Sequence, residues 1–151
     1  MRMSIEQASV DDGQAIVQLL LKSGLPVDGL LDHMNTAIVA RDEGRVVGCA
    51  ALEIYADGGL LRSVAVDAAA RGRGIGTQLT TAALDLASTR GVPAVYLLTT
   101  TAEEFFPRLA FQRIDRQQVP ASVQASVEFR SACPSTAIVM KRALRQHFLH
   151  R

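Results

Sequence analysis

A glycine-rich loop between an apolar run and a helical pattern most constrains how this chain can fold. The loop reads Arg71-Gly72-Arg73-Gly74-Ile75-Gly76, follows residues 60–66, and precedes a helix predicted to continue to about Arg90. Glycines permit a tight turn whose backbone N–H groups converge on one place, and a helix start adds unpaired N–H donors and the positive end of the helix dipole. The loop therefore predicts a site for a phosphate or diphosphate group.

Two common nucleotide-binding motifs do not fit this loop. A P-loop has a lysine and then Ser or Thr after its last glycine, whereas Gly76 is followed directly by Thr77. A dinucleotide fingerprint needs G-x-G-x-x-G spacing and an acidic residue at the end of the next strand, and residues 94–101 contain none. Spacing alone leaves open a plain strand–helix turn with solvated arginines.

Composition indicates one ordinary globular domain around the loop. The chain has 151 residues, of which 48% are hydrophobic and 21% charged, and its net charge of +1 gives no broad field for nucleic acid or an anionic membrane. No apolar run approaches the roughly 20 residues of a membrane span, and the N-terminus lacks the apolar stretch of a signal peptide. Cys49, expected in the core, and Cys133 form neither a disulfide framework nor a metal cluster. We therefore expect a cytoplasmic protein without a metal, a nucleic-acid partner or membrane contact.

The remaining patterns predict an α+β (α/β) single domain with a central mixed, mostly antiparallel sheet flanked by helices. Strands are expected at residues 4–8, 37–40, 45–54, 60–66, 94–100, 111–116 and 137–141. Helices are expected from Ser9 or Asp11 to Gly24, at 30–34, from the loop to about 90, at about 102–109, and as a turn at 120–126. The domain is expected to cover residues 1–144, and 145–151 to be a C-terminal tail ending in a frayed helix.

Two motifs in this order resemble the GNAT superfamily of acyl-CoA-dependent N-acyltransferases. The first is the Val64-Ala65-Val66 triplet followed by the glycine loop, and the second is Phe105-Phe106-Pro107-Arg108-Leu109-Ala110-Phe111. The resemblance covers about residues 4–141 and implies the GNAT fold. A narrower similarity, to arsenic-resistance-associated N-acetyltransferases, is carried by residues 60–64 and 97–101 and by Glu128-Phe129 before Cys133-Pro134.

The resemblance implies an enzyme that moves an acetyl group from acetyl-CoA to a primary amine of a small amino-acid-like, organoarsenical or other xenobiotic molecule, by direct attack in a ternary complex. The strands at 60–66 and 94–100 would splay apart, and an N–H near Val64 and Ala65 would bind the thioester oxygen as it gains charge. A homodimer is compatible with this resemblance, because dimers are frequent in such folds. The implied cofactor-binding residues are Val64, Ala65, Val66, Arg71, Gly72, Arg73, Gly74, Ile75, Gly76, Thr77, Phe105 and Phe106.

Phe106 departs from the family pattern, because many members have a tyrosine there that protonates the departing thiolate. A positioned acid contributes about 10²–10⁴ in rate. A thiol with a pKa near 8.5 leaves as a thiolate at pH 7 at a cost of only about 2 kcal/mol, so the reaction survives this loss. Water or a hydroxyl of Ser63, Thr99, Thr100 or Ser126 could then donate the proton. The same departure leaves a non-catalytic acyl-CoA binding or sensing module as the alternative.

Polar residues near the expected splay are candidates for catalysis and acceptor binding. Glu53 is the candidate general base, with a solvated strand-end charge as the alternative reading. Arg62 is two residues from Val64, so strand alternation predicts that both side chains face the thioester. Arg62 would hold an anionic group of the acceptor or else pair with Glu53. The predicted catalytic residues are Glu53, Arg62 and Ser63, and the predicted acceptor residues are Arg62, Thr99, Thr100 and Glu128.

Overall fold

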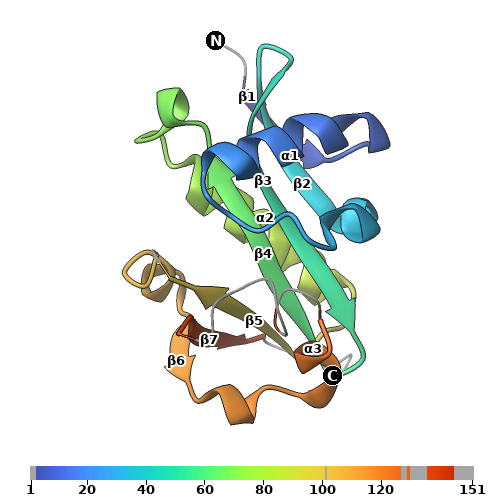
Figure 1. Ribbon diagram of the computed structural model, residues 1–151, viewed down its shortest axis with the longest axis vertical. Coiled ribbons are helices and arrows are strands. Elements are labelled where there is room, and N and C mark those ends of the chain that lie inside the picture. Colours follow the sequence, from blue (N-terminus) through green and yellow to red (C-terminus); the bar gives the residue numbers. More distant parts are fainter. Residues whose placement is uncertain (1–2, 101, 127–128, 130–135, 145–151) are drawn as a thin grey trace, which may run out of the picture.

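A single seven-stranded sheet organises the computed structural model, which describes residues 3–100, 102–126, 129 and 136–144. Every pair of neighbouring strands is antiparallel except β4 and β5, which are parallel. This confirms the predicted mixed, mostly antiparallel sheet (Figure 1). The strands, in their order across the sheet, are β1 (Met3–Gln7), β2 (Ala37–Asp42), β3 (Arg45–Tyr55), β4 (Gly58–Val66), β5 (Ala94–Thr99), β7 (Ile138–Ala143) and β6 (Gln112–Ile114).

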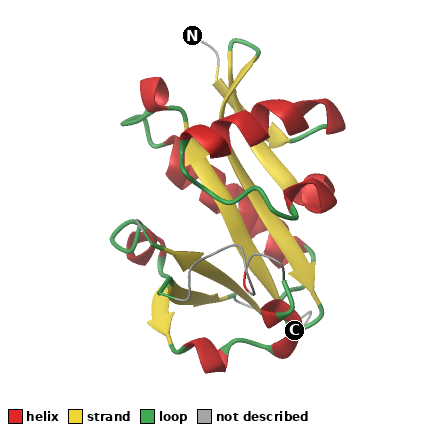
Figure 2. Cartoon of the chain, viewed as in Figure 1, coloured by secondary structure: helices red, strands yellow, loops and turns green. Residues whose placement is uncertain are grey.

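The two longest helices cover opposite faces of the sheet, α1 (Gly13–Lys22) in front and α2 (Ile75–Thr89) behind (Figures 1 and 2). Helix α1 packs Ile16 and Leu20 against one face, while α2 packs Ile75 and Leu79 against the other. Each helix therefore buries the apolar stripe that its sequence predicts. The shorter helical segments are η1 (Val10–Asp12), η2 (Leu30–Thr36), η3 (Ala68–Ala70), η4 (Phe106–Leu109), η5 (Arg116–Gln118) and α3 (Ala121–Gln124).

Two predicted elements are shorter in the structure. The helix expected at about 102–109 is only η4, and the strand expected at 111–116 is only β6. Around η4 the backbone bonds span three residues, as from Arg108 N–H to the carbonyl of Phe105, and Ala110 has a φ of 67° that ends the segment. This tight geometry cannot continue as a regular α-helix.

A β-bulge interrupts β4 where the prediction assumed regular alternation. Ala65 pairs with Cys49 and Arg62 with Ala51, so two residues of β4, Ser63 and Val64, lie opposite one residue of β3. Ser63 has a φ of 60°, the left-handed conformation that accommodates the extra residue.

The bulge overturns the prediction that Arg62 and Val64 share a face. Arg62 pairs with Ala51, which belongs to the core beneath α1, whereas Val64 packs against the core beneath α2. An inserted residue shifts the alternation by one position, so the two side chains lie on opposite sides of the sheet.

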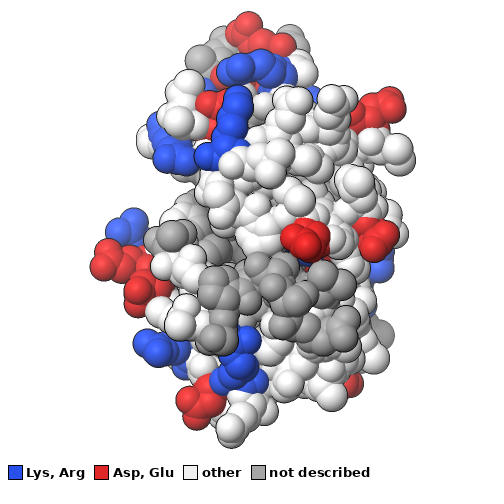
Figure 3. All heavy atoms as spheres, viewed as in Figure 1, with Lys and Arg blue, Asp and Glu red and all other residues white. Residues whose placement is uncertain are grey.

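Charged side chains of both signs are interspersed on the face shown in Figure 3, rather than gathered into a field of one sign. Within the described ranges no helix is both long and apolar enough to cross a bilayer. The helix expected at the C-terminal tail, 145–151, lies outside the described residues.

Candidate active site

The strands β4 and β5 part shortly after they begin to pair. Their parallel ladder consists of Gly59 with Val95 and Leu60 with Tyr96, although β4 continues to Val66 and β5 to Thr99. A cavity of about 1060 Å³ lies where the strands diverge. The splay therefore leaves β4 backbone facing an open space instead of another strand.

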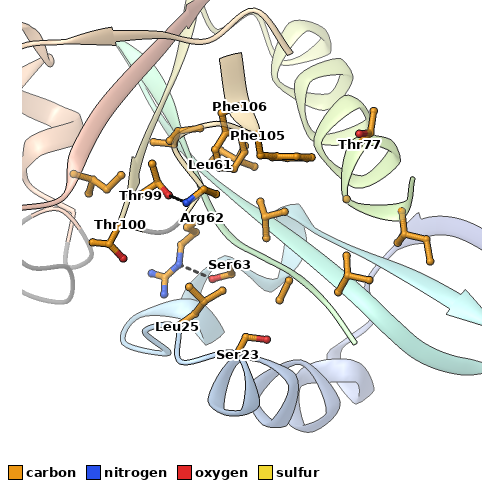
Figure 4. Close-up of a pocket in the computed structure, with 18 of the residues that line it drawn as sticks. Ser23, Leu25, Leu61, Arg62, Ser63, Thr77, Thr99, Thr100, Phe105 and Phe106 are labelled. Atoms are coloured by element: carbon orange, nitrogen blue, oxygen red, sulfur yellow. Dashed lines mark hydrogen bonds between the residues drawn. The ribbon is translucent and has the colours of Figure 1, made fainter. Parts of the chain in front are cut away.

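The cavity brings together most of the predicted site residues (Figure 4). Its walls come from β4, the glycine loop and the start of α2, the end of β5, and the segment around η4. Glu53 and Arg73 are not among the lining residues, and Glu128 lies outside the described residues. The predicted residues that line the cavity are Arg62, Ser63, Val64, Ala65, Val66, Arg71, Gly72, Gly74, Ile75, Gly76, Thr77, Thr99, Thr100, Phe105 and Phe106.

The glycine loop has the geometry that an anion site requires. Gly72 has a φ of 84° and Gly74 a φ of 74°, and a Cβ at either position would meet nothing within 4 Å. The backbone conformation, not crowding by the protein, therefore selects glycine here. Gly74 is the N-cap of α2, so the amides of the first turn of this 15-residue helix have no partner within the helix and their dipoles favour a negative charge. A diphosphate fits this donor set.

The two arginines of the loop have different orientations. The Nε of Arg71 donates to the carbonyl of Val66 at 3.2 Å, which keeps this side chain beside the cavity. The Nη1 of Arg73 lies 3.1 Å from Oδ2 of Asp42, the last residue of β2. Only Arg71 of the pair therefore brings its side chain to the cavity wall.

A buried ion pair lies behind the β4 wall. The Nη1 of Arg62 is 2.9 Å from Oε2 of Glu53, and the two residues are only 3% and 1% exposed. Of the two roles that the sequence leaves open for Arg62, the structure shows the pairing with Glu53. His33 Nε2 is 3.7 Å from the same carboxylate oxygen, and the Tyr55 hydroxyl donates to Oε1.

These neighbours keep Glu53 ionised. Burial acts to raise the pKa of its carboxyl, but hydrogen bonds from Tyr55, Ser126 and Arg62 outweigh that effect and hold the pKa below its usual value. Burial and the bond to Glu53 in turn raise the pKa of Tyr55 to about 12, so its hydroxyl remains a donor.

Ser63, at the bulge, is held through both its side chain and its backbone. Its Oγ accepts a hydrogen bond from Nε of Arg62, and its carbonyl accepts one from the Cys49 thiol, each at 3.1 Å. Figure 4 shows the Arg62 side chain reaching past Ser63 toward Leu25. Burial raises the pKa of Cys49 to about 12, which keeps the thiol protonated and able to donate. The structure thus agrees with the expectation that Cys49 is a core residue.

The aromatic motif packs onto the start of α2. Phe106 is buried and makes edge-to-face contacts with Phe105 and Phe111, at ring-centroid distances of 5.0 and 5.7 Å. A Cβ added at Gly76 would lie 3.5 Å from the Phe105 ring, in ordinary contact. Nearby, the Thr99 hydroxyl accepts the N–H of Ala102 at 2.9 Å. The second motif therefore builds the wall opposite β4.

Sequence reasoning missed one wall of the cavity. Residues after α1 close the side that faces Arg62, and the carbonyl of Pro26 accepts from Arg62 Nη2 at 3.4 Å. The only signal in the sequence is a Gly-Leu-Pro break, which reads as a plain loop. Tyr55 was also missed, although its place two residues after Glu53 puts both on one face of β3. The residues of this missed wall are Ser23, Gly24, Leu25, Pro26 and Asp28.

A splayed mixed sheet with a glycine-rich loop at the start of a helix is the arrangement of the acetyltransferase (GNAT) fold. The sequence profile of the acetyltransferase (GNAT) domain matches residues 33–113, and the chain belongs to this family. It is therefore an acetyltransferase whose co-substrate is acetyl-CoA.

Proteins similar in sequence are also acetyltransferases. The chain is 30% identical over 134 residues to an uncharacterized N-acetyltransferase of Chlorobaculum tepidum, covering 86% of this chain and 84% of the relative. It is 41% identical over 81 residues to an amino-acid acetyltransferase of Mycobacterium tuberculosis, covering 53% of this chain and 46% of the relative. The similarity to the second protein thus concerns about half of each chain.

Solved structures have the same fold. A Mycobacterium tuberculosis protein in complex with CoA superposes with a TM-score of 0.79 at 27% identity, covering 94% of this chain and 99% of that one. N-acetylglutamate synthase from Neisseria gonorrhoeae, in complex with CoA and N-acetyl-glutamate, gives a TM-score of 0.82 at 24% identity. That match covers 97% of this chain but 36% of the synthase, so it shows the fold of one part of a longer protein.

Proposed function

We propose that this protein acetylates the primary amine of a small amino-acid-like molecule, by direct attack of the amine on the thioester of acetyl-CoA while both are bound. The observation that carries this proposal is one cavity that joins the anion-binding loop to the splay between β4 and β5. Two sequence and structure relatives, an amino-acid acetyltransferase and a synthase bound to N-acetyl-glutamate, support an amino-acid-like acceptor.

Acetyl-CoA supplies an activated acetyl group, and this chain supplies its position. The amides of Gly74, Ile75, Gly76 and Thr77 would hold the diphosphate at the positive end of α2. The main chain of β4 from Val64 to Val66, which has no partner strand on the β5 side, would bind the pantetheine arm as an added strand. The thioester would then lie in the splay.

Backbone and hydroxyl groups at the splay support the transfer. The N–H of Val64 would donate to the thioester oxygen as it gains negative charge. The Ala65 N–H, like that of Asp67, faces β3, so it is not this donor. The Oγ of Ser63 accepts from Arg62, so the Ser63 hydroxyl keeps a proton to donate to the departing sulfur. Thr99 and Thr100 also line the cavity and are further candidates for this donor. Phe106, which is buried and lacks a hydroxyl, takes no part in the proton transfer.

The narrower acceptor class is an amino-acid-like organoarsenical, supported by the motifs at residues 60–64 and 97–101. It carries the same primary amine and a carboxylate, so the same cavity could serve it. Arg62 would contribute its positive charge behind the wall, although the charge is partly balanced by Glu53. An acceptor panel distinguishes these molecules directly.

The deciding experiment measures thiol release from acetyl-CoA with a panel of amines. The panel contains amino acids, their amides, an amino-acid organoarsenical and a blank, with the acetylated product identified by mass spectrometry. We expect turnover with at least one amino-acid-like acceptor. Binding of acetyl-CoA in calorimetry without turnover for any amine would instead favour a sensing module.

A further inference from the structure

The proposed chemistry gives no direct contact with acetyl-CoA or the acceptor to the buried side chains of Arg62 and Glu53. Arg62 lines the cavity, yet its side chain has no exposed surface, and the Glu53 side chain is only 2% exposed. Removing two charges from water costs free energy, which is offset only when the ion pair has good geometry and further hydrogen bonds. Neither side chain presents an accessible surface to an acceptor.

The guanidinium of Arg62 connects three parts of the fold. Nη1 binds Glu53 of β3 at 2.9 Å, and Nε binds the Ser63 hydroxyl in the bulge at 3.1 Å. Nη2 donates to the carbonyl of Pro26, in the segment that follows α1, at 3.4 Å. The bulge is thereby tied both to the neighbouring strand and to the wall that covers it.

Glu53 is itself held from the opposite side. The Tyr55 hydroxyl donates to Oε1, while Arg62 occupies Oε2. With both oxygens engaged and its pKa lowered, Glu53 is a weak base, which argues against direct removal of a proton from the amine. Its carboxylate instead fixes where the Arg62 guanidinium lies.

A bulge needs such support, because its extra residue leaves the strand ladder. Ser63 adopts a φ of 60°, which is uncommon for a residue other than glycine. Arg62 binds its side chain, and the Cys49 thiol binds its carbonyl. The next residues of β4, Val64 and Ala65, line the cavity at the splay. The direction of the Val64 N–H depends on how the bulge is held.

We propose that Tyr55, Glu53 and Arg62 are positioning residues that fix the bulge at Ser63 and so aim the backbone N–H of Val64 at the thioester oxygen. This inference rests on the proposed function. It assigns Glu53 and Arg62 to backbone geometry rather than to proton removal or contact with the acceptor.

The test uses three variants and a matched control. Glu53→Gln removes the charge that holds Arg62, and Tyr55→Phe removes only the hydroxyl behind Glu53. Glu53→Gln combined with Arg62→Gln removes both charges, so it avoids leaving one buried charge unpaired. Glu6→Gln makes the same chemical change in the exposed ion pair of Glu6 with Arg41, away from the cavity lining.

Two readouts do not depend on turnover. In the ligand-free protein, hydrogen exchange of the amides at residues 62–66 should accelerate about tenfold or more in Glu53→Gln and in the double variant. It should accelerate less in Tyr55→Phe and not in Glu6→Gln. With bound acetyl-CoA, a ¹³C-labelled thioester carbonyl should absorb at lower frequency in the wild type, because an N–H donor binds it. In Glu53→Gln and in the double variant, part of this shift should be lost.

Kinetics separate positioning from the two other roles. In Glu53→Gln and in the double variant, we expect kcat to fall about tenfold or more below the wild-type value, equally for every acceptor. The Kd for acetyl-CoA should stay within about threefold of the wild-type value, and the shape of the pH profile should be retained. Loss of the acid limb in Glu53→Gln would overturn the inference in favour of a general base. A rise in KM confined to acceptors with a carboxylate would overturn it in favour of acceptor contact.

Failure of the two proposals can be told apart. If the wild-type protein neither binds acetyl-CoA nor acetylates any amine, the proposed function is wrong, and the positioning inference that rests on it is wrong too. If the wild type is active but exchange at residues 62–66, the carbonyl band and kcat are unchanged in the double variant, the positioning inference alone is wrong. Should Glu53→Gln not fold, Tyr55→Phe and the double variant give the same readouts.

Discussion

Individual side chains at the bulge replace hydrogen bonds that the strand ladder no longer supplies. The carbonyl of Ser63 has a thiol as its donor, and the hydroxyl of Ser63 has a guanidinium. A buried carbonyl without a hydrogen-bond donor costs free energy, and the Cys49 thiol supplies that donor within an otherwise apolar core. The residue identity at position 49 therefore follows from a donor requirement as well as from volume.

Cys49 should be almost inert to alkylation in the folded protein. It is 1% exposed and its pKa is raised to about 12, whereas an ordinary thiol has a pKa near 8.5, so its thiolate fraction at pH 8 is reduced at least about a hundredfold. We expect iodoacetamide to modify Cys49 at pH 8 at least about a hundred times more slowly in native buffer than in urea. Mass spectrometry of the peptide that contains Cys49 measures this separately from Cys133. Rapid native modification of Cys49 would contradict the buried thiol.

Glu53 should make the protein sensitive to acid. Because its pKa is lower in the folded state than its usual value of 4.5, the stabilisation it provides is present above that value and is lost as the pH falls through the folded pKa. We expect the Tm of the wild type to fall below about pH 4.5, and the Tm difference from Glu53→Gln to narrow there. Asp12 also has a lowered pKa, from its bond with Arg41, so Asp12→Asn serves as the comparison. An unchanged Tm difference from pH 7 to pH 3 would contradict this assignment.

At the scale of elements, sequence pattern predicted what depends on periodicity and missed what depends on a local irregularity. The helix after the glycine loop and the strands before it were predicted, because their apolar residues repeat at regular intervals. The bulge at Ser63 was not predicted, because nothing in the composition of β4 indicates it. It nevertheless moves the side chains on one side of Ser63 to the opposite face of the sheet. The wall after α1 was missed for a related reason: its residues carry no charge pattern that indicates a site.

The start of α2 should show opposite effects of charge on folding and on ligand binding. An aspartate at position 74 tolerates the left-handed conformation and favours the positive helix end, but it places a negative charge where the diphosphate would bind. We expect the acetyl-CoA Kd of Gly74→Asp to be at least about tenfold higher than that of Gly74→Asn. The Tm of Gly74→Asp should equal or exceed that of Gly74→Asn. Calorimetry at two salt concentrations measures both Kd values.

Asparagine is the matched control for position 74, because it has nearly the same shape and the same tolerance of positive φ without the charge. A Cβ at this position meets no atom within 4 Å, so the protein itself does not distinguish the two variants by crowding. The difference between them should shrink at high salt, as expected for an electrostatic effect. Equal Kd values for the two variants would mean that the diphosphate binds elsewhere.

At the scale of the whole molecule, the sheet is weakest where the ligand would enter. Only two residue pairs join β4 to β5, while β3 and β4 pair along most of their length. A ligand in the splay would contact the loop and β4 on one side and the end of β5 and η4 on the other. Binding should therefore stabilise the connection between the two parts of the sheet rather than one local segment.

Acetyl-CoA should raise the Tm of the protein by more than a fragment that reaches only the loop. At a concentration about 100 times Kd, a ligand that binds only the folded state adds about 2.7 kcal/mol, which for a chain of this length corresponds to a Tm increase of roughly 5–11 °C. Adenosine diphosphate shares the diphosphate but lacks the pantetheine arm, so at the same concentration it should give a much smaller increase. Differential scanning fluorimetry compares the two, and Gly74→Asp should reduce the increase for both. Equal increases for the two ligands would show that binding ends at the loop, and then the splay between β4 and β5 would not be where the thioester is held.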